Sequence, residues 1–254
     1  MRQPMQTIRA SLTQLILGLS VSLLSLSAFA SVEIEHWQTS KGTDVYFVGA
    51  QQLPMVDVEL RFDAGSARDG EAYGLAAMTN RLLGTATPKY DETAIAQGFN
   101  QLGAQFGQSA GRDSATLSLR TLTRDSLYEP AIDLFEQLLV EAVFRPDILK
   151  REKARLEVAI KQKATQPPAL ASMALWSRLY GDHPYAHPTE GTLASLDRLT
   201  RDRLQAFYDR HYVARNAQVT IVGDLSRAEA EALAERLTQR LPAGESPEPI
   251  AAVS

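Results

Sequence analysis

The sequence of 254 residues predicts an α+β fold. Three strand-like runs crowd into the early part of the chain, at residues 32–62. Helical periodicity dominates afterwards, interrupted by one hairpin at residues 104–122 and one late strand at residues 217–223. Strands and helices that are grouped in this way, rather than strictly alternating, favour an α+β layout over a doubly wound parallel sheet.

The early strands follow from side-chain alternation. Residues 32–37 (VEIEHW) and 56–62 (VDVELRF) alternate, and residues 44–48 (DVYFV) are rich in β-branched and aromatic side chains. Turn-forming segments at residues 39–43 (TSKGT) and 51–54 (QQLP) separate these runs. We therefore expect three consecutive strands.

Apolar residues at helical spacing predict the helices. The first covers residues 73–83, after a glycine-containing turn, and the second covers residues 91–102, with Gly103 just after its end. In the hairpin, residues 104–110 and 114–122 flank the turn Gly111-Arg112-Asp113. The remaining helices are expected at residues 127–143, 147–163, 169–180, 200–208 and 226–241. Ser226 and Glu229 form a capping box at the start of the last one.

The helix at residues 147–163 is strongly charged. Its apolar positions are few: Ile148, Leu149, Leu156 and Ile160. Such a pattern leaves a wide solvated face. The carboxylates Glu152 and Glu157 are therefore expected to face solvent.

The first thirty residues differ from the rest. Arg2 and Arg9 make the start positive, residues 15–29 are apolar, and residues 28–30 (AFA) match the A-x-A pattern of a cleavage site. This arrangement predicts a secretory signal peptide at residues 1–30, cleaved after Ala30. A membrane anchor is the alternative, disfavoured because the stretch is short and serine-rich. The chain has no cysteine, so export points to a bacterial periplasm rather than a disulfide-rich extracellular scaffold.

Charge and composition exclude some functions. Cleavage removes two of the 26 basic residues and none of the 30 acidic ones, which leaves a net charge of −6. A nucleic-acid binder would need a basic face. No later segment is apolar for long enough to span a membrane. Residues 31–241 are expected to form one domain, and residues 242–254, rich in Pro, Gly and Ser, to form a linker or disordered tail. A linker there suggests that a second domain normally follows.

Candidate catalytic side chains are few. The histidines are His36, His183, His187 and His211. His187 and Glu190 form H-x-x-E, half of a metal motif, but nearby prolines and a glycine prevent the continuous helix that would place both ligands on one face. His36 and His211 are expected to be structural or surface residues, with His211 at a helix end where a cation favours the helix dipole. No G-x-S-x-G nucleophile motif and no phosphate-binding loop occur.

Several separated segments fit one family together. Residues 56–76 (VDVELRFDAGSARDGEAYGLA) join a strand to a glycine turn. Residues 180–225 contain, in order, His183-Pro184-Tyr185, Gly191-Thr192, Phe207-Tyr208, Asn216-Ala217 and Val222-Gly223-Asp224. With the helix and hairpin of residues 84–121 between them, these segments resemble the insulinase/pitrilysin family of zinc peptidases, which includes the mitochondrial processing peptidase subunits. The resemblance covers residues 33–241 and implies an antiparallel-rich sheet covered by helices.

Active members of the family carry H-x-x-E-H on the helix after the glycine turn. Their two histidines bind zinc, and the glutamate activates the metal-bound water. In residues 74–83 (GLAAMTNRLL), Ala77, Asn80 and Arg81 stand in these three places. Alanine cannot ligate a metal, asparagine cannot accept a proton at neutral pH, and arginine is a permanent cation. The family's third ligand, a glutamate, would fall near Val158 or Ala159, with Glu157 close by.

The resemblance therefore implies a non-catalytic subunit that binds no zinc, with zinc expected only in a catalytic partner. In this family such a subunit forms a heterodimer with a catalytic homologue and helps to hold the peptide substrate. The peptide adds to an edge strand as an extra strand. The matching peptide-binding candidates here are Gln105, Phe106, Gly107, Gln108 and Ser109. A plain structural hairpin is the alternative for this segment.

Two other interpretations stay open. A zinc-dependent metalloendopeptidase with displaced ligands would use His183, His187 and Glu190. A structural scaffold subunit would instead bind a partner that lacks peptidase activity. Family subunits usually contain two related domains of this size, so this chain, which matches the first alone, is expected to be a truncated product or a stand-alone half.

Overall fold

The computed structural model describes residues 33–253. The predicted signal peptide, residues 1–30, lies outside the described residues. The chain divides into two units, Met1–Glu33 and Ile34–Ser254, and the second contains every helix and strand considered below. No helix in residues 33–253 is both long and apolar enough to cross a membrane.

A six-stranded sheet is the centre of the domain, in the order β1-β2-β6-β3-β5-β4. Its strands are β1 (Glu35–Gln38), β2 (Asp44–Gly49), β3 (Met55–Phe62), β4 (Gln105–Ala110), β5 (Ala115–Leu122) and β6 (Ala217–Gly223). Strand β6 pairs parallel with β2 and antiparallel with β3. All other neighbours are antiparallel, which agrees with the antiparallel-rich sheet that the sequence implies.

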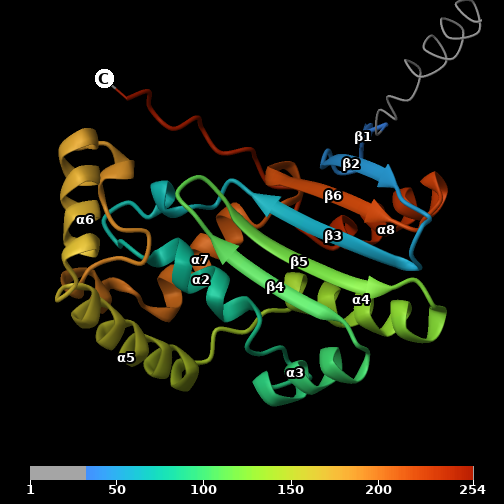
Figure 1. Cartoon of the computed structure of the whole chain (residues 1–254), viewed down its shortest axis with the longest axis horizontal. Coiled ribbons are helices and arrows are strands. Elements are labelled where there is room, and N and C mark those ends of the chain that lie inside the picture. The colour runs from blue at the N-terminus through green and yellow to red at the C-terminus, as the bar shows by residue number, and fades with distance from the viewer. Residues whose placement is uncertain (1–32, 254) are drawn as a thin grey trace, which may run out of the picture. The chain divides into compact units, whose positions relative to one another are not determined.

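One face of the sheet is buried and the other is polar. The alternating residues of β3 that point to the core, Val56, Val58, Leu60 and Phe62, are at most 1% exposed. On the opposite face, Asp57 of β3 receives two hydrogen bonds from Arg120 of β5. This pattern is typical of an antiparallel sheet covered on one side only. Figure 1 shows the helices α4 (Asp125–Val140) and α8 (Arg227–Gln239) behind the sheet.

The helices agree closely with the periodicity of the sequence. Besides α4 and α8, they are α2 (Leu75–Leu83), α3 (Glu92–Gln101), α5 (Pro146–Lys163), α6 (Pro167–Tyr180) and α7 (Arg201–His211). The capping box of Ser226 and Glu229 is present at the start of α8. Asp91 caps α3, as its side chain accepts a hydrogen bond from the Ala94 N–H at 2.8 Å. The α+β fold is therefore confirmed in its order of elements.

Residues 242–253 contain no helix or strand, but they lie against the domain. The N–H of Ala214 donates to the Pro242 carbonyl at 2.8 Å, and the N–H of Arg215 donates to the Ala243 carbonyl at 3.1 Å. Arg68 donates to the Glu248 carbonyl at 2.6 Å. The segment predicted as a linker or tail thus follows a defined path along the surface.

Candidate functional site

Helix α2 begins at a sharp backbone turn that sets its position. Gly74 has φ of +93°, a conformation that residues with a side chain rarely adopt. The buried carboxylate of Asp69 accepts hydrogen bonds from the Gly74 and Ala76 N–H groups at 2.7 and 2.8 Å. Burial raises the pKa of Asp69 to about 7, against the lowering effect of these two bonds. The glycine and the aspartate together fix where the helix starts.

The three residues at the expected motif positions all line one open cleft of about 830 Å³, but they differ in burial. Ala77 and Arg81 lie four residues apart, on the same face of α2. Asn80 is 2% exposed, on the side of α2 that faces the sheet. Its amide nitrogen donates to the Thr116 carbonyl on β5 at 3.1 Å and to the Tyr212 hydroxyl at 3.5 Å. Asn80 therefore ties α2 to its surroundings.

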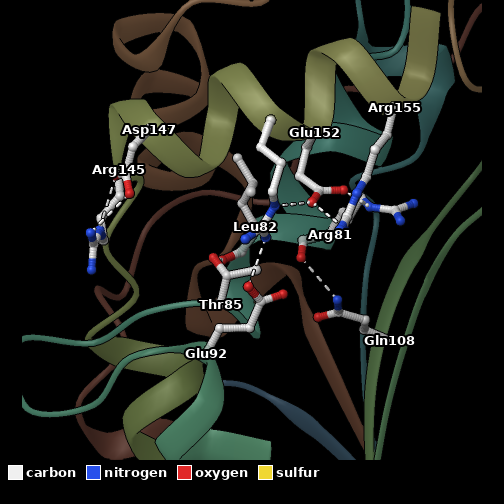
Figure 2. A network of polar contacts seen from close by, with 10 residues as sticks. Arg81, Leu82, Thr85, Glu92, Gln108, Arg145, Asp147, Glu152 and Arg155 are labelled. Carbon is white, nitrogen blue, oxygen red and sulfur yellow. Dashed lines mark hydrogen bonds and ion pairs between the residues drawn. The ribbon is translucent and has the colours of Figure 1, made fainter. Parts of the chain in front are cut away.

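Arg81 belongs to a group that we call the ion-pair cluster: Arg81, Arg151, Glu152 and Arg155. Figure 2 shows Arg81, Glu152 and Arg155 of this cluster. The Nε of Arg81 lies 2.8 Å from Oε2 of Glu152. On α5, the Nε of Arg151 and an Nη of Arg155 lie 3.0 and 2.7 Å from Oε1 of the same carboxylate. Burial by itself raises the pKa of Glu152, but hydrogen bonds from Arg151 and Arg81 outweigh it, and the pKa falls below its usual value.

The expectation that Glu152 faces solvent is wrong. Its side chain is 3% exposed, because α5 packs against α2 at this point and the carboxylate meets Arg81 there. A signal was present in the sequence. Glu152 follows Leu149 by three residues and precedes Leu156 by four, so it stands in the apolar stripe of α5. Glu157 lies outside this stripe, is 46% exposed and pairs with Lys161 at 2.6 Å.

The candidate peptide-binding strand β4 forms the wall of the cleft next to α2. Phe106, Gln108 and Ser109 line the cleft, together with Arg81 and Arg155. The side-chain amide of Gln108 donates to the Arg81 carbonyl at 2.9 Å, which joins the strand to the helix. Gln105, the first residue of the strand, is exposed. Strand β4 is an end strand of the sheet formed by the described residues, so one side of its backbone has no strand neighbour there.

Two residues of β4 show how closely the strand fits its neighbours. A Cβ atom added to Gly107 would lie 2.6 Å from the Ser118 hydroxyl on β5, so a larger residue does not fit there without a shift. Phe106 stacks on Phe99 of α3, with ring centroids 5.4 Å apart. Strand β4 thus packs against both β5 and α3, and Phe106 also lines the cleft.

Comparison with known proteins identifies the family. Residues 47–193 match the family model described as insulinase (peptidase family M16). The chain belongs to the M16 family. Residues 198–253 match a second model, the peptidase M16 inactive domain, which includes most of the C-terminal segment that packs along the surface.

Some of the M16 relatives are named as proteases and one is named as a non-peptidase. An uncharacterized zinc protease of Rickettsia felis is 23% identical over 83% of this chain and 52% of its own length. The non-peptidase homologue YmxG of Helicobacter pylori is 30% identical over 68% of this chain and 40% of its own. The chain therefore spans about half the length, or less, of these relatives.

Solved structures show the same fold. A peptidase M16 inactive domain from Pseudomonas fluorescens has a TM-score of 0.86 and 40% identity, over 88% of this chain and 54% of that one. The first half of the periplasmic protease PqqL from Escherichia coli has a TM-score of 0.75 and 18% identity, over 86% of this chain and 49% of that one. The expected resemblance to the first domain of a two-domain M16 subunit is thereby confirmed.

The residues of this M16 chain do not fit a zinc ion at the position of the family motif. Arg81 places a permanent cation where a neutral ligand is needed, and Glu152 is already held by three guanidinium groups. At the expected place of the third ligand, Ala159 lines the cleft and has no ligand atom, while Val158 is 55% exposed. In residues 33–253 no group of three or more His, Cys, Asp or Glu side chains is placed to hold a metal ion.

The displaced-ligand candidates are engaged separately. His183 accepts a hydrogen bond from the Tyr185 N–H at 3.1 Å, as the N-cap of a short 3-10 helix. His187 is buried and stacks on Tyr73, with centroids 4.1 Å apart, and burial lowers its pKa. Glu190 forms an ion pair with Lys163. The structure does not assemble these three side chains into a metal site among the described residues.

The other two histidines have different surroundings. His36 is half-exposed and lies 3.0 Å from Asp44 of the next strand. His211 ends α7 but is 5% exposed, and burial, with the charges of Arg210 and Arg68, lowers its pKa to about 4. The expectation that His211 acts as a cation on the helix dipole is wrong, because a histidine with this pKa is neutral at pH 7.

Proposed function

We propose that this chain is a non-catalytic M16 domain that binds extended peptide along β4 and pairs with a catalytic M16 homologue. The ion-pair cluster is the observation that carries the proposal. In it, Arg81 bonds to Glu152 on the face of α2 where the family places metal ligands. Three members of the cluster, Arg81, Glu152 and Arg155, line the cleft and bring hydrogen-bonded charge to it.

Peptide binding is supported by the position of β4. An end strand offers backbone N–H and C=O groups to a further strand, and pockets for alternate side chains supply selectivity. The cleft of about 830 Å³ beside β4 lies within the size range of ligand pockets. A peptide added to β4 would therefore run along the cleft wall, with every second side chain pointing toward α2.

The partner and the compartment are parts of the same proposal. A domain that spans about half of a two-domain relative leaves room for a second M16 domain. The periplasm is proposed because the N-terminal residues have the pattern of a signal peptide and the structurally similar PqqL is a periplasmic protease.

The experiment combines metal analysis, peptidase activity and binding on the purified protein. We expect less than stoichiometric zinc by elemental analysis and no cleavage of unstructured peptides by the chain alone. A labelled extended peptide should bind, as measured by fluorescence anisotropy. The same peptide with N-methyl groups on alternate backbone nitrogens is the matched control, and one of the two methylation registers should bind at least ten-fold more weakly.

Two results would contradict the proposal. Stoichiometric zinc together with chelator-sensitive cleavage would favour the alternative, a zinc peptidase with displaced ligands. Equal binding of the peptide and both methylated forms would exclude backbone pairing. Partner choice is tested separately by light scattering of mixtures with an M16 protein from the same genome that carries H-x-x-E-H, for which we expect a one-to-one complex.

A further inference from the structure

The ion pairs at the cleft carry one more positive than negative charge. Three carboxylates and two arginines line the cleft: Glu92, Glu152, Glu190, Arg81 and Arg155. Two cations outside the lining complete the pairs, Arg151 with Glu92 and Lys163 with Glu190. In this set of ion pairs, four cations meet three carboxylates. Each carboxylate already has a cationic partner, and one positive charge is left over.

The surplus charge is concentrated on two arginines that keep unused donors. Arg81 contacts Glu152 through Nε, and Arg155 contacts it through one Nη. A guanidinium has five N–H donors, so most donors of each group stay without a partner among the described residues. The side chains are 61% and 59% exposed. Figure 2 shows them meeting at Glu152 from two different helices.

The buried carboxylate holds both arginines in place before any ligand arrives. Glu152 is 3% exposed, so it acts as a fixed anchor beneath the two guanidinium groups. An arginine held in this way loses less side-chain entropy when it binds a second carboxylate than a free surface arginine does. The arrangement favours an incoming anion and repels an incoming cation.

These donors lie beside the proposed peptide strand. The carbonyl of Arg81 accepts the hydrogen bond from Gln108 of β4 at 2.9 Å, and both arginines line the cleft together with Phe106 and Ser109. A side chain of a peptide paired with β4 that points toward α2 therefore faces Arg81 and Arg155.

The geometry points to an acidic-peptide subsite: the cleft selects an extended peptide whose α2-facing side chain is Asp or Glu, bound by Arg81 and Arg155. This inference rests on the proposed function, because it assumes a peptide on β4. It assigns to Arg81 a binding role in the place of a metal ligand. Lysine and arginine at the same peptide position are rejected by the surplus positive charge.

The test uses the full chain and one host peptide in three forms, with a central Glu, Gln or Lys. Gln matches Glu in shape and lacks its charge. Fluorescence anisotropy at low and at high salt gives the dissociation constants. We expect the Glu peptide to bind about ten-fold more tightly than the Gln peptide, a difference of about 1.4 kcal/mol, since charge-assisted hydrogen bonds are stronger than those to a neutral amide. The Lys peptide should bind most weakly. High salt should reduce the differences between the dissociation constants of the three peptides, because it screens charge.

A variant then assigns the effect to the cleft. Arg155→Met leaves Glu152 with two arginine partners and should reduce the preference for Glu over Gln to about two-fold or less. Lys161→Met, which removes an exposed cation of the same helix paired with Glu157, is the matched control and should keep the full preference. Thermal unfolding of each variant checks that it is folded, and the three-peptide comparison on the unchanged chain requires no variant.

The outcomes separate the two proposals. Equal binding of the Glu, Gln and Lys peptides, each weakened by N-methylation, overturns the acidic subsite and keeps peptide binding on β4. Binding of none of them overturns both. A preference for Glu that survives Arg155→Met in full also overturns the subsite, because it places the selecting charge elsewhere.

Discussion

Glu152→Gln removes the centre of the ion-pair cluster with little change of shape. The carboxylate receives hydrogen bonds from three guanidinium groups, at 2.8, 3.0 and 2.7 Å. Glutamine keeps one acceptor oxygen, but it loses the charge and turns an amide N–H₂ toward a cation. The variant therefore tests whether this cluster holds α5 against α2.

The magnitude follows from the contacts and their exposure. Removal of a hydrogen bond between charged groups costs roughly 1.5–3 kcal/mol, which gives roughly 5–9 kcal/mol for three. The arginine side chains are 39–61% exposed, so water replaces much of what they lose. With one oxygen retained, we expect the free energy of unfolding to fall by about 2 kcal/mol.

The assay is urea denaturation at pH 7 and at lower pH. With a slope of roughly 2–3 kcal/mol per M, the midpoint should fall by about 1 M. The pKa of Glu152 is held below its usual value, so its stabilisation is present above the unfolded-state pKa of about 4.3 and is lost as pH falls through the folded-state pKa. The difference between the wild-type protein and the variant should shrink accordingly in acid.

A matched control lies on the same helix. Glu157→Gln removes an exposed carboxylate with a single lysine partner and should change the free energy of unfolding by less than about 0.5 kcal/mol. If Glu152→Gln is no more destabilising than Glu157→Gln at pH 7, the cluster does not stabilise the domain and our account of it is refuted.

Three further predictions concern other parts of the domain. Gly74→Ala should lower the free energy of unfolding, measured in urea, by about 2–4 kcal/mol, since φ is +93° and the new Cβ would lie 2.5 Å from the Glu190 carbonyl. Gly70→Ala is the control: φ is +56° and the space around it is open, so the loss should be only about 1–2 kcal/mol. Equal losses in the two variants would contradict the role of the Glu190 contact. Ser226→Ala should cost about 1 kcal/mol by loss of the cap of α8, and an unchanged midpoint would count against it. Between about pH 6.5 and 4 the unfolded chain protonates His211 while the folded chain keeps it neutral. The free energy of unfolding therefore decreases as the pH is lowered, by up to about 1.4 kcal/mol per pH unit. His211→Phe should reduce this pH dependence, and an identical dependence in both proteins would disprove the prediction.

The elements of the fold were predictable because their signals are local. The alternation of residues 56–62 matches β3 (Met55–Phe62), and the capping box of Ser226 marks the start of α8. Strand pairing was less accessible. The parallel pairing of β2 with β6 joins segments that are distant in sequence, and no local pattern encodes such a pairing.

The candidate site was predictable in its positions but not in its contacts. The resemblance placed Ala77 and Arg81 on one helix, and both line the cleft. The sequence analysis did not predict Glu152 as the partner of Arg81. Glu152 lies among many charged residues, so its position in the apolar stripe of α5 is hard to recognise. Burial of a carboxylate depends on what another helix brings to it, and this information is absent from the sequence of α5 alone.

The place of β6 in the sheet has a consequence for the growing chain. Strands β2 and β3 are close in sequence, yet the strand that joins them begins only at Ala217. Until the ribosome has delivered that segment, β2 and β3 each present an unpaired edge, which is the feature that invites wrong strand pairing between chains. Premature termination before β6 should therefore yield an aggregating product rather than a smaller folded one, because the strand that closes the middle of the sheet is missing.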